Sequence, residues 1–404
     1  MSFNILAADT CCMSDPPVQA VILAAGEGRR LTPLTNRRPK PMIPVANRPL
    51  LEYIVEAVAA AGLDHITLVV GYHQERIRTH FGDGDDWGVT INYVEQTNQL
   101  GTGHAVLQAE PTIDGPFVVL NGDRVVDPAI VERVAVAVRD GSAPTVTVTS
   151  TNTPREYGVV TREGESVTKI KEKPTGPVET NQINAGIYGF SPAFFETIRT
   201  THTSGELTLT AALNKHARKH GNINSLMYSG QWLDVSNLWD LLIVNAGLIE
   251  TAAPSHSEQQ ATTGDVSIAD DAVIAESVRF GPNVTIGGNT AVGRNVRIEP
   301  NAVVENAIIF PDAVIGAGAV VRDAVVASNA RIGPNATLDG TPGTLVVDDT
   351  AHHDVKLGGV IGDNTRIGPG ATLTTGAVVG DDVTTDAGVT IDSRIQAGAT
   401  VRQG

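Results

Sequence analysis

Residues 23–41 read Leu-Ala-Ala-Gly-Glu-Gly-Arg-Arg-Leu-Thr-Pro-Leu-Thr-Asn-Arg-Arg-Pro-Lys-Pro. The apolar run 18–23 leads into this stretch and predicts a buried first strand that ends at a glycine-rich turn. Such a turn lets backbone N–H groups approach phosphate oxygens, because glycine has no Cβ to obstruct them. Arg30 and Lys40 would add positive charge at the same place. The stretch therefore predicts a phosphate site directly after the first strand.

The turn differs from the two common glycine-rich nucleotide motifs. It lacks the Gly-Lys-Ser/Thr ending of a phosphate loop and the third glycine of a dinucleotide fingerprint. Taken alone, such a turn can also be no more than a tight strand-to-helix connection. The residues further along the chain must therefore decide its role.

From residue 18 to about residue 249, apolar runs alternate with amphipathic stretches. Strands are predicted at 66–70, 90–94 and 117–120, and helices at 50–61 and 129–139. This alternation predicts a domain over residues 18–250 with a Rossmann-like, mostly parallel sheet and helices on both faces. Ligands of such sheets bind at the carboxyl ends of the strands.

The pattern changes near residue 252. Residues 251–264 are short and polar and are interpreted as a linker to a second domain over residues 265–404. There an apolar residue recurs every six positions, which does not suit a helix but suits a prism of short, stacked parallel strands. This is typical of a left-handed β-helix of hexapeptide repeats, with residues 339–359 as a projecting loop or arm. The predicted inward-facing residues include Ile268, Ile274, Phe280, Ile286, Val292, Ile298, Val304, Phe310, Ile315, Val321, Val326, Ile332 and Leu338.

The bulk composition narrows the class of protein. The 404 residues suffice for two domains, and the net charge of −16 argues against a general nucleic-acid binder. No stretch approaches the roughly 18 apolar residues that a membrane span requires. Cys11 and Cys12 are adjacent and cannot staple a core, which indicates a cytoplasmic protein. Residues 1–17 lack the features of a signal peptide and are interpreted as a disordered tail.

Three polar motifs follow predicted strands or turns. Asp123 comes after the apolar strand 117–120, where a carboxylate beside a phosphate loop suits Mg²⁺, although a turn Asp is the alternative. Asp234, in Trp-Leu-Asp-Val, is a second lone carboxylate that could equally be an N-cap. In the run 96–104, the amide of Gln96 could pair with the imide edge of uracil or thymine, and Gly101 would let the backbone approach a base. A polar loop is the alternative reading of that run.

The complete stretch 23–41 closely resembles the signature Gly-x-Gly-Thr-Arg-Leu…Pro-Lys-Pro of the sugar-1-phosphate nucleotidyltransferases, with Arg29 in place of Thr. The run 96–104 resembles the Gln-Leu-Gly-Thr-Gly-His segment of the pyrimidine-using members. Residues 232–236 resemble their Trp-x-Asp-x-Gly, with Ser236 in the Gly position. Further matches follow in the family's order: Tyr157-Gly158, Glu172-Lys173-Pro174 and Asn184-Ala185-Gly186.

The resemblance implies an enzyme that transfers a nucleoside monophosphate from UTP or dTTP to a hexose-1-phosphate and releases pyrophosphate. It implies Mg²⁺ held by Asp123 and Asp234, and catalytic roles for Arg30, Lys40 and Lys173. Arg30 would hold the β- and γ-phosphates, and Lys40 would neutralise charge at the α-phosphorus. The sugar would contact Gly158, Glu172 and Asn184. The nucleotide would be bound by Leu23, Ala25, Gly26, Gly28, Gln96, Gly101 and Thr102.

The role of the second domain stays open at this point. In similar archaeal enzymes with this domain order, the hexapeptide prism also acetylates glucosamine-1-phosphate. Residues 330–336 lack the histidine expected for that step, and His352 or His353 in the arm could replace it. Alternatively the prism only assembles a homo-oligomer, a trimer or a multiple of one. A non-catalytic regulatory subunit is the third alternative, against which the retained Arg30 and Lys40 argue.

Overall fold

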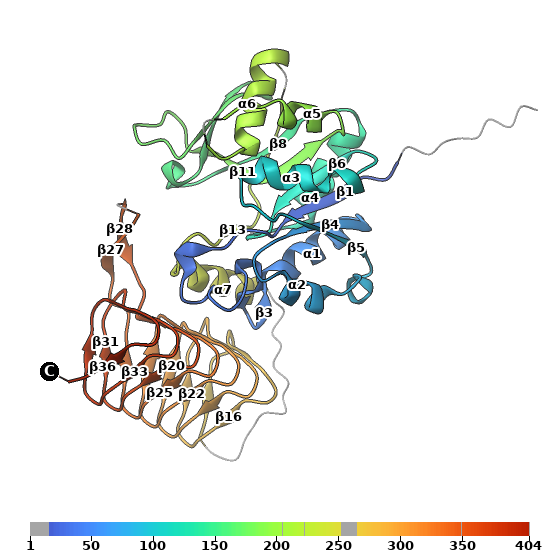
Figure 1. Ribbon diagram of the computed structural model, residues 1–404. Coiled ribbons are helices and arrows are strands. Elements are labelled where there is room, and N and C mark those ends of the chain that lie inside the picture. The colour runs from blue at the N-terminus through green and yellow to red at the C-terminus, as the bar shows by residue number, and fades with distance from the viewer. Residues whose placement is uncertain (1–15, 204, 222, 252–264, 349, 404) are drawn as a thin grey trace, which may run out of the picture.

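The computed structural model describes residues 16–203, 205–221, 223–251, 265–348 and 350–403. It contains an α/β body and a β-helix that lies against one side of it (Figure 1). The predicted tail 1–17 and linker 251–264 fall almost wholly outside the described residues. Among the described residues, no helix has the length and apolar character needed to cross a membrane.

The α/β body is built on a mixed sheet, with nine strands in the described residues in the order β5-β4-β1-β6-β11-β8-β12-β10-β9. The first four strands are parallel, and β11 then pairs antiparallel with both β6 and β8. The sheet is therefore less parallel than the sequence predicted, since short connections such as the one between β9 and β10 favour antiparallel neighbours. The strands are β1 Gln19–Leu23, β4 His65–Val70, β5 Thr90–Glu95, β6 Phe117–Asn121, β8 Thr145–Ser150, β9 Gly158–Glu163, β10 Ser166–Glu172, β11 Gln182–Phe190 and β12 Asn224–Met227.

Helices cover both faces of this sheet, as predicted, and the strands alternate between two apolar cores. On β1, Ala20 and Ile22 face one core, whereas Val21 faces the other. The first core includes residues of α1, α2 and α4, and the second includes residues of α3, α5 and α6. The helices are α1 Leu50–Ala60, α2 Gln74–Phe81, α3 Thr102–Ala109, α4 Pro128–Arg139, α5 Phe194–Arg199, α6 Leu209–His220 and α7 Asp240–Thr251.

Two small two-stranded sheets extend the α/β body beyond the main sheet. β2 Pro44–Val45 pairs with β3 Arg48–Pro49, and β7 Arg124–Val126 pairs antiparallel with β13 Trp232–Asp234. The second of these sheets places Asp234 opposite Arg124 in the register. Segments 110 residues apart in the sequence are thereby joined at one point.

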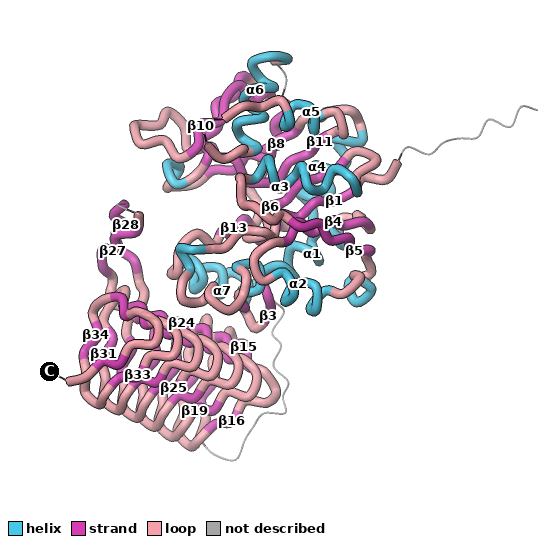
Figure 2. Tube along the Cα trace, viewed as in Figure 1, coloured by secondary structure: helices cyan, strands magenta, loops and turns pink. Residues whose placement is uncertain are grey.

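The second body is the predicted prism, in which three parallel sheets form the walls (Figure 2). One wall contains β14 Ser267–Ile268, β17 Thr285–Ile286, β20 Val303–Glu305, β23 Val320–Arg322, β26 Thr337–Leu338, β31 Thr372–Leu373 and β34 Thr390–Ile391. The second contains β15 Val273–Ile274, β18 Ala291–Val292, β21 Ile308–Ile309, β24 Ala324–Val326, β29 Gly359–Ile361, β32 Val378–Val379 and β35 Arg394–Ile395. The third contains β16 Arg279–Phe280, β19 Arg297–Ile298, β22 Val314–Ile315, β25 Arg331–Ile332, β30 Arg366–Ile367, β33 Thr384–Thr385 and β36 Thr400–Val401.

The interior of the prism confirms the six-residue pattern with one exception. Residues such as Ile286, Val304 and Leu338 form its core, but Ile309 takes the inward place predicted for Phe310. The one-residue slip therefore comes before position 310 and not after it. Phe310 belongs instead to an apolar cluster shared with the α/β body, and the Arg38 guanidinium lies 4.9 Å from the centre of its ring.

The prism docks on the α/β body through its second wall. The shared apolar cluster joins Ile308, Val325 and Val360 of that wall to residues of α7 and of the stretch 31–50. The Arg38 guanidinium reaches both carboxylate oxygens of Asp363, at 2.7 and 2.8 Å, in a buried ion pair. The stretch that carries the signature is thus held between the two bodies.

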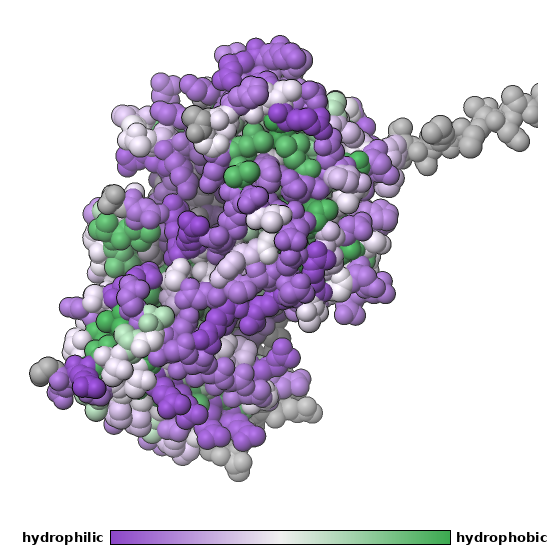
Figure 3. Space-filling model, viewed as in Figure 1, coloured by the Kyte–Doolittle hydropathy of each residue, from purple (hydrophilic) through white to green (hydrophobic). Residues whose placement is uncertain are grey.

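The predicted arm is a hairpin of β27 Gly343–Val347 and β28 Thr350–Val355 that rises from the prism beside the α/β body (Figure 1). It carries one of the hydrophobic patches on this face of the molecule, and Val346 is 69% exposed (Figure 3).

Candidate active site

Two adjoining cavities open at the carboxyl ends of the parallel strands. The first, of about 950 Å³, is lined by residues that follow β1, β4, β5 and β6. The second, of about 520 Å³, lies toward β9, β10 and β11. Lys40 and Asp123 line both cavities and mark their junction. The position at the strand ends agrees with the expectation for α/β sheets.

The structure brings together every site residue that the sequence predicted. The residues proposed for the nucleotide all line the first cavity: Leu23, Ala25, Gly26, Gly28, Gln96, Gly101 and Thr102. The residues proposed for the sugar and its phosphate line the second: Gly158, Glu172, Lys173 and Asn184. Asp234 and Arg30 also line the second cavity, although the resemblance assigns Arg30 to the β- and γ-phosphates.

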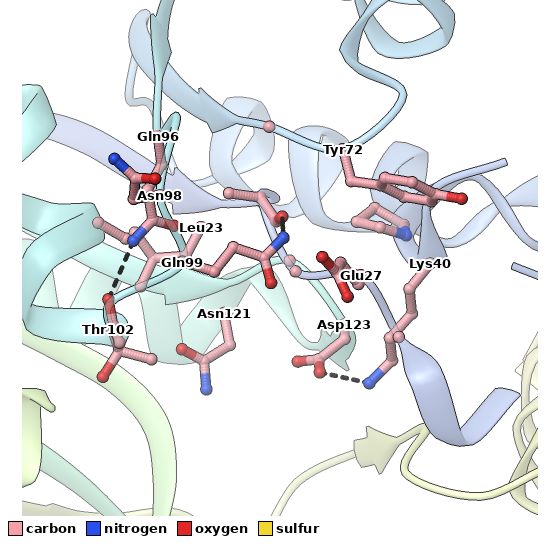
Figure 4. A pocket seen from close by; sticks show the side chains of 18 of the residues that line it. Leu23, Glu27, Lys40, Tyr72, Gln96, Asn98, Gln99, Thr102, Asn121 and Asp123 are labelled. Carbon is pink, nitrogen blue, oxygen red and sulfur yellow. Dashed lines mark hydrogen bonds and ion pairs between the residues drawn. The ribbon is translucent and has the colours of Figure 1, made fainter. Parts of the chain in front are cut away.

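The junction of the cavities is formed by an ion pair. Lys40 Nζ lies 2.5 Å from Asp123 Oδ2, as the dashed line in Figure 4 marks. Burial opposes ionisation of Asp123, but the nearby charges of Lys40 and Arg124 outweigh it and lower the pKa of this carboxyl. Gly28 makes the pair possible, because its φ is 66° and a Cβ there would lie 2.8 Å from the Lys40 Cβ.

Arg124 is the main site residue that sequence reasoning missed. Its Nε donates to Asp234 Oδ1 at 3.1 Å, and its guanidinium lies 5.3 Å from the ring centre of Trp232. Gly186 leaves room for it, since a Cβ there would lie 2.3 Å from Arg124 Nη1. Asp234 also accepts from the Ser236 hydroxyl at 2.7 Å. The one available signal was that Arg124 directly follows Asp123 in the sequence.

The two carboxylates fit a divalent cation that is completed by substrate. Within the described residues there is no cluster of three or more His, Cys, Asp or Glu side chains that could hold a metal by itself. Mg²⁺ commonly takes one or two carboxylates together with substrate phosphates and water. Asp123 at the junction and Asp234 in the second cavity meet that requirement where phosphates would lie.

The amide of Gln96 has a fixed orientation. Its Nε2 lies 3.2 Å from Gly101 O and 3.0 Å from His104 Nδ1, and the side chain is buried at the edge of the first cavity. Both contacts use the amide nitrogen, so Oε1 is the atom left for an incoming donor. His104 lies in the first turn of α3, and its contact with Gln96 gives it a positioning role.

Gln99 is another residue that sequence reasoning did not single out. Its Nε2 donates to the carbonyl of Ala25 at 2.9 Å, across the first cavity from Lys40 (Figure 4). This bond links the loop after β5 to the loop after β1. The two loops that line the first cavity are therefore held at a fixed separation.

Asp240, at the start of α7, shapes the loop that follows Asp234. Its Oδ2 accepts hydrogen bonds from the backbone N–H groups of Ser236 at 2.9 Å and Asn237 at 2.6 Å. Burial raises the pKa of Asp240 from 3.8 to about 6, because lost hydration disfavours the charge more than these bonds favour it. The folded pKa exceeds the unfolded one, so the ionised group destabilises the fold. The penalty is absent below pH 3.8, grows with pH and is complete above about pH 6.

We expect Asp240→Asn to raise the free energy of unfolding by about 1–3 kcal/mol at about pH 7.5, because it removes the desolvated charge. At about pH 4 the gain should fall below about 0.6 kcal/mol, because Asp240 is then protonated in the folded wild type. Urea denaturation of both proteins at the two pH values measures the difference. An equal gain in the free energy of unfolding at both pH values would contradict the raised pKa of Asp240.

Comparison with known proteins assigns the family. Residues 19–251 match the nucleotidyl transferase family, which covers more than half of the chain. The chain belongs to this family. Residues 263–355 match the GMPPB C-terminal domain, and residues 358–393 match six bacterial transferase hexapeptide repeats. The nucleotidyl transferase match confirms the family that the stretch 23–41 indicated, and the repeats confirm the β-helix.

Several curated proteins and solved structures of this nucleotidyl transferase family are similar to the α/β body. The bifunctional protein GlmU of Methanococcus aeolicus is 37% identical over 236 residues, which are 58% of this chain and 55% of that protein. The chain thus aligns with only about half the length of that relative. A glucose-1-phosphate thymidylyltransferase of Streptomyces antibioticus is 35% identical over 59% of this chain and 68% of its own length. A crystal structure described as a glucose-1-phosphate thymidylyltransferase of Bacillus anthracis aligns with a TM-score of 0.54 and 25% identity, covering 58% of this chain and 96% of that one.

Proposed function

We propose that this chain is a sugar-1-phosphate nucleotidyltransferase that transfers a nucleoside monophosphate from UTP or dTTP to a hexose-1-phosphate and releases pyrophosphate. The acceptor would be glucose-1-phosphate or its N-acetylamino counterpart. One observation carries the proposal: two cavities of substrate size meet at the Lys40–Asp123 pair, on a nucleotidyl transferase fold. The reaction requires two substrates whose phosphates meet at one charged point, and the junction provides it.

The reaction needs positioning and charge neutralisation more than acid–base chemistry. The attacking oxygen of the sugar phosphate is already an anion, so no general base is required. Lys40 would stabilise the negative charge that gathers around the α-phosphorus, and Lys173 would hold the incoming phosphate. Arg30 and the amides of the turn 26–28 would bind the remaining phosphate oxygens.

A divalent cation, proposed as Mg²⁺, would neutralise the charge of the phosphates when it is bound by Asp123 and Asp234. Arg124 would then act as a fixed cation beside Asp234, on the side of the second cavity. Residues 18–250 would supply the groups that contact the substrates.

The β-helix over residues 265–404 would assemble the enzyme into a homo-oligomer, using the two walls that do not face the α/β body. Acetyl transfer finds less support, because the His352 ring packs 4.9 Å from the Trp239 ring and His353 Nδ1 contacts Thr344 Oγ1 at 3.0 Å within the arm. His352 also lies 3.7 Å from Glu156 of the α/β body, so its side chain is engaged away from the prism. A non-catalytic regulatory subunit is disfavoured by the presence of Lys40, Asp123, Arg30 and Asp234 in the two cavities. We propose a cytoplasmic location, since nothing in the chemistry requires a membrane.

A pyrophosphate-release assay tests the proposal directly. UTP, dTTP, ATP and GTP would each be paired with glucose-, galactose-, mannose- and N-acetylglucosamine-1-phosphate in the presence of Mg²⁺. We expect release with a pyrimidine triphosphate and none after chelation of the metal. Absence of release with every pair, from folded full-length protein, would refute the function.

Gln96→Ala should mainly weaken binding of the pyrimidine triphosphate. The freed Oε1 of Gln96 can accept from the imide N–H of uracil or thymine in both the ground state and the transition state, so it contributes uniform binding. We expect KM to rise about ten-fold, the scale of one lost hydrogen bond, with a much smaller change in kcat. Steady-state kinetics with the preferred pyrimidine nucleotide measure this effect, and KM for a purine triphosphate is the control. An unchanged KM for the pyrimidine nucleotide would show that Gln96 does not contact the base.

A further inference from the structure

The arm of the β-helix reaches the rim of the second cavity. At its tip, Asp348 Oδ2 accepts a hydrogen bond from Arg30 Nε at 2.7 Å, across 318 residues of sequence. Lower on the arm, His352 Nδ1 lies 3.7 Å from Glu156 Oε1. Both Arg30 and Glu156 line the second cavity. The arm therefore contacts two residues of the candidate site from outside.

The geometry at Arg30 leaves its phosphate-binding edge available. Among the described residues, Arg30 donates from Nε alone, and its two Nη nitrogens make no hydrogen bond. A guanidinium is planar and carries five N–H donors. A carboxylate bound to Nε therefore fixes the orientation of the group and leaves the N–H donors of the two Nη nitrogens available for a phosphate. The side chain of Arg30 is 42% exposed and starts from a short turn. Without the contact to Asp348, it would have to lose rotamer freedom each time it bound a phosphate, at a cost in binding free energy.

The arm and the signature stretch are both anchored, so the Arg30–Asp348 contact has a defined place. Midway along the arm, Leu345 packs against the shared apolar cluster, and the ring of His352, its cross-strand partner, lies 4.9 Å from the ring of Trp239. The stretch 36–38 docks on the prism: Asn36 bonds Asp381 at 2.7 Å, Arg37 bonds Asp382 at 2.5 Å and Arg38 bonds Asp363. The β-helix thus contacts the signature stretch at two places, through Arg30 and, eight residues on, through the buried Arg38–Asp363 pair.

We propose that Asp348 is a positioning residue for Arg30, so that the β-helix arm is a working part of the nucleotidyl transfer site. This inference rests on the proposed function of the α/β body. Asp348 orients the guanidinium toward the phosphates at the junction, and Arg30 makes the contact with substrate. The β-helix then contributes to catalysis as well as to assembly.

The test is a double-mutant cycle on the full-length protein, read as kcat and KM for pyrophosphate release. We expect Asp348→Ala to lower kcat/KM about two- to five-fold, the range of a partly exposed ion pair, with an unchanged melting temperature. Asp348→Glu should restore most of the loss. In the Arg30→Ala background, the further change Asp348→Ala should have no effect, because Asp348 acts only through Arg30.

The matched control is Asp382→Ala. Asp382 also forms a partly exposed pair between the two bodies, but its partner Arg37 lines neither cavity, so kcat/KM should stay unchanged. Three results would overturn the inference: unchanged kcat/KM in Asp348→Ala, an equal loss in the Arg30→Ala background, or a gain in kcat, which would mean that Asp348 competes with phosphate. Wild-type protein that releases no pyrophosphate would instead refute the proposed function itself.

Discussion

We expect the Asp123→Asn variant to lose about 100-fold or more of its turnover in nucleotidyl transfer, the scale of removing one main electrostatic stabiliser. Asp123 lies where the two cavities meet, 2.5 Å from Lys40. The neutral amide of Asn binds a divalent cation weakly and cannot form an ion pair with Lys40. Both the cation and the lysine would then be misplaced when charge gathers at the α-phosphorus.

Steady-state pyrophosphate release measures this loss, and calorimetric titration of Mn²⁺ in the presence of the nucleotide reports the metal separately. Asp140→Asn is a suitable control, since Asp140 is an exposed residue at the end of α4 and lines neither cavity. The proposed role of Asp123 predicts weaker Mn²⁺ binding together with lower turnover. Turnover near that of the wild type would remove Asp123 from the site.

The second large effect concerns stability. Asp363→Ala should lower the free energy of unfolding by about 3–5 kcal/mol, because it leaves the Arg38 guanidinium as an unpaired buried charge. Only 8% of the Arg38 side chain and 5% of the Asp363 side chain are exposed. Asp363 Oδ1 also accepts the backbone N–H of Ser328 at 2.9 Å, so the substitution removes a bond within the prism as well.

Chemical denaturation of the full-length chain measures this effect, and Asp382→Ala is again the comparison. Arg37 and Asp382 are 43% and 50% exposed, so breaking their pair should cost less than about 1 kcal/mol. A double variant, Arg38→Met with Asp363→Leu, should recover much of the lost stability, because an apolar pair leaves no charge buried. If Asp363→Ala and Asp382→Ala lowered the free energy of unfolding equally, burial of the Arg38–Asp363 pair would not be the cause of the loss.

Most of the fold follows from the amino-acid sequence alone, because the patterns that predict it are local. The alternation of strands and helices up to α4 follows from apolar periodicity over short windows, and so does the six-residue repeat. The repeat also located the arm, since residues 339–359 break the period. The antiparallel half of the main sheet was not predicted, because most of its pairings, such as those of β11 with β6 and β8, join segments that are distant in the sequence. The inward place of Ile309 was also missed: two adjacent apolar residues satisfy the repeat equally, and only the docking surface separates them.

The candidate site was likewise predictable from the sequence only in part. The sequence determined its residue types, because motifs such as Gly122-Asp123 follow strands that end at one edge of the sheet. Which charged groups meet is known only from the folded structure: Lys40 pairs with Asp123, Arg124 with Asp234, and Arg30 with Asp348. Each of these pairs joins segments at least 83 residues apart, and an ion pair leaves no periodic trace in a sequence. Such contacts exist only after hydrophobic packing has brought distant segments together. The Arg30–Asp348 contact also requires the two bodies to dock, which is why the arm's place at the active site could not be foreseen from the residues alone.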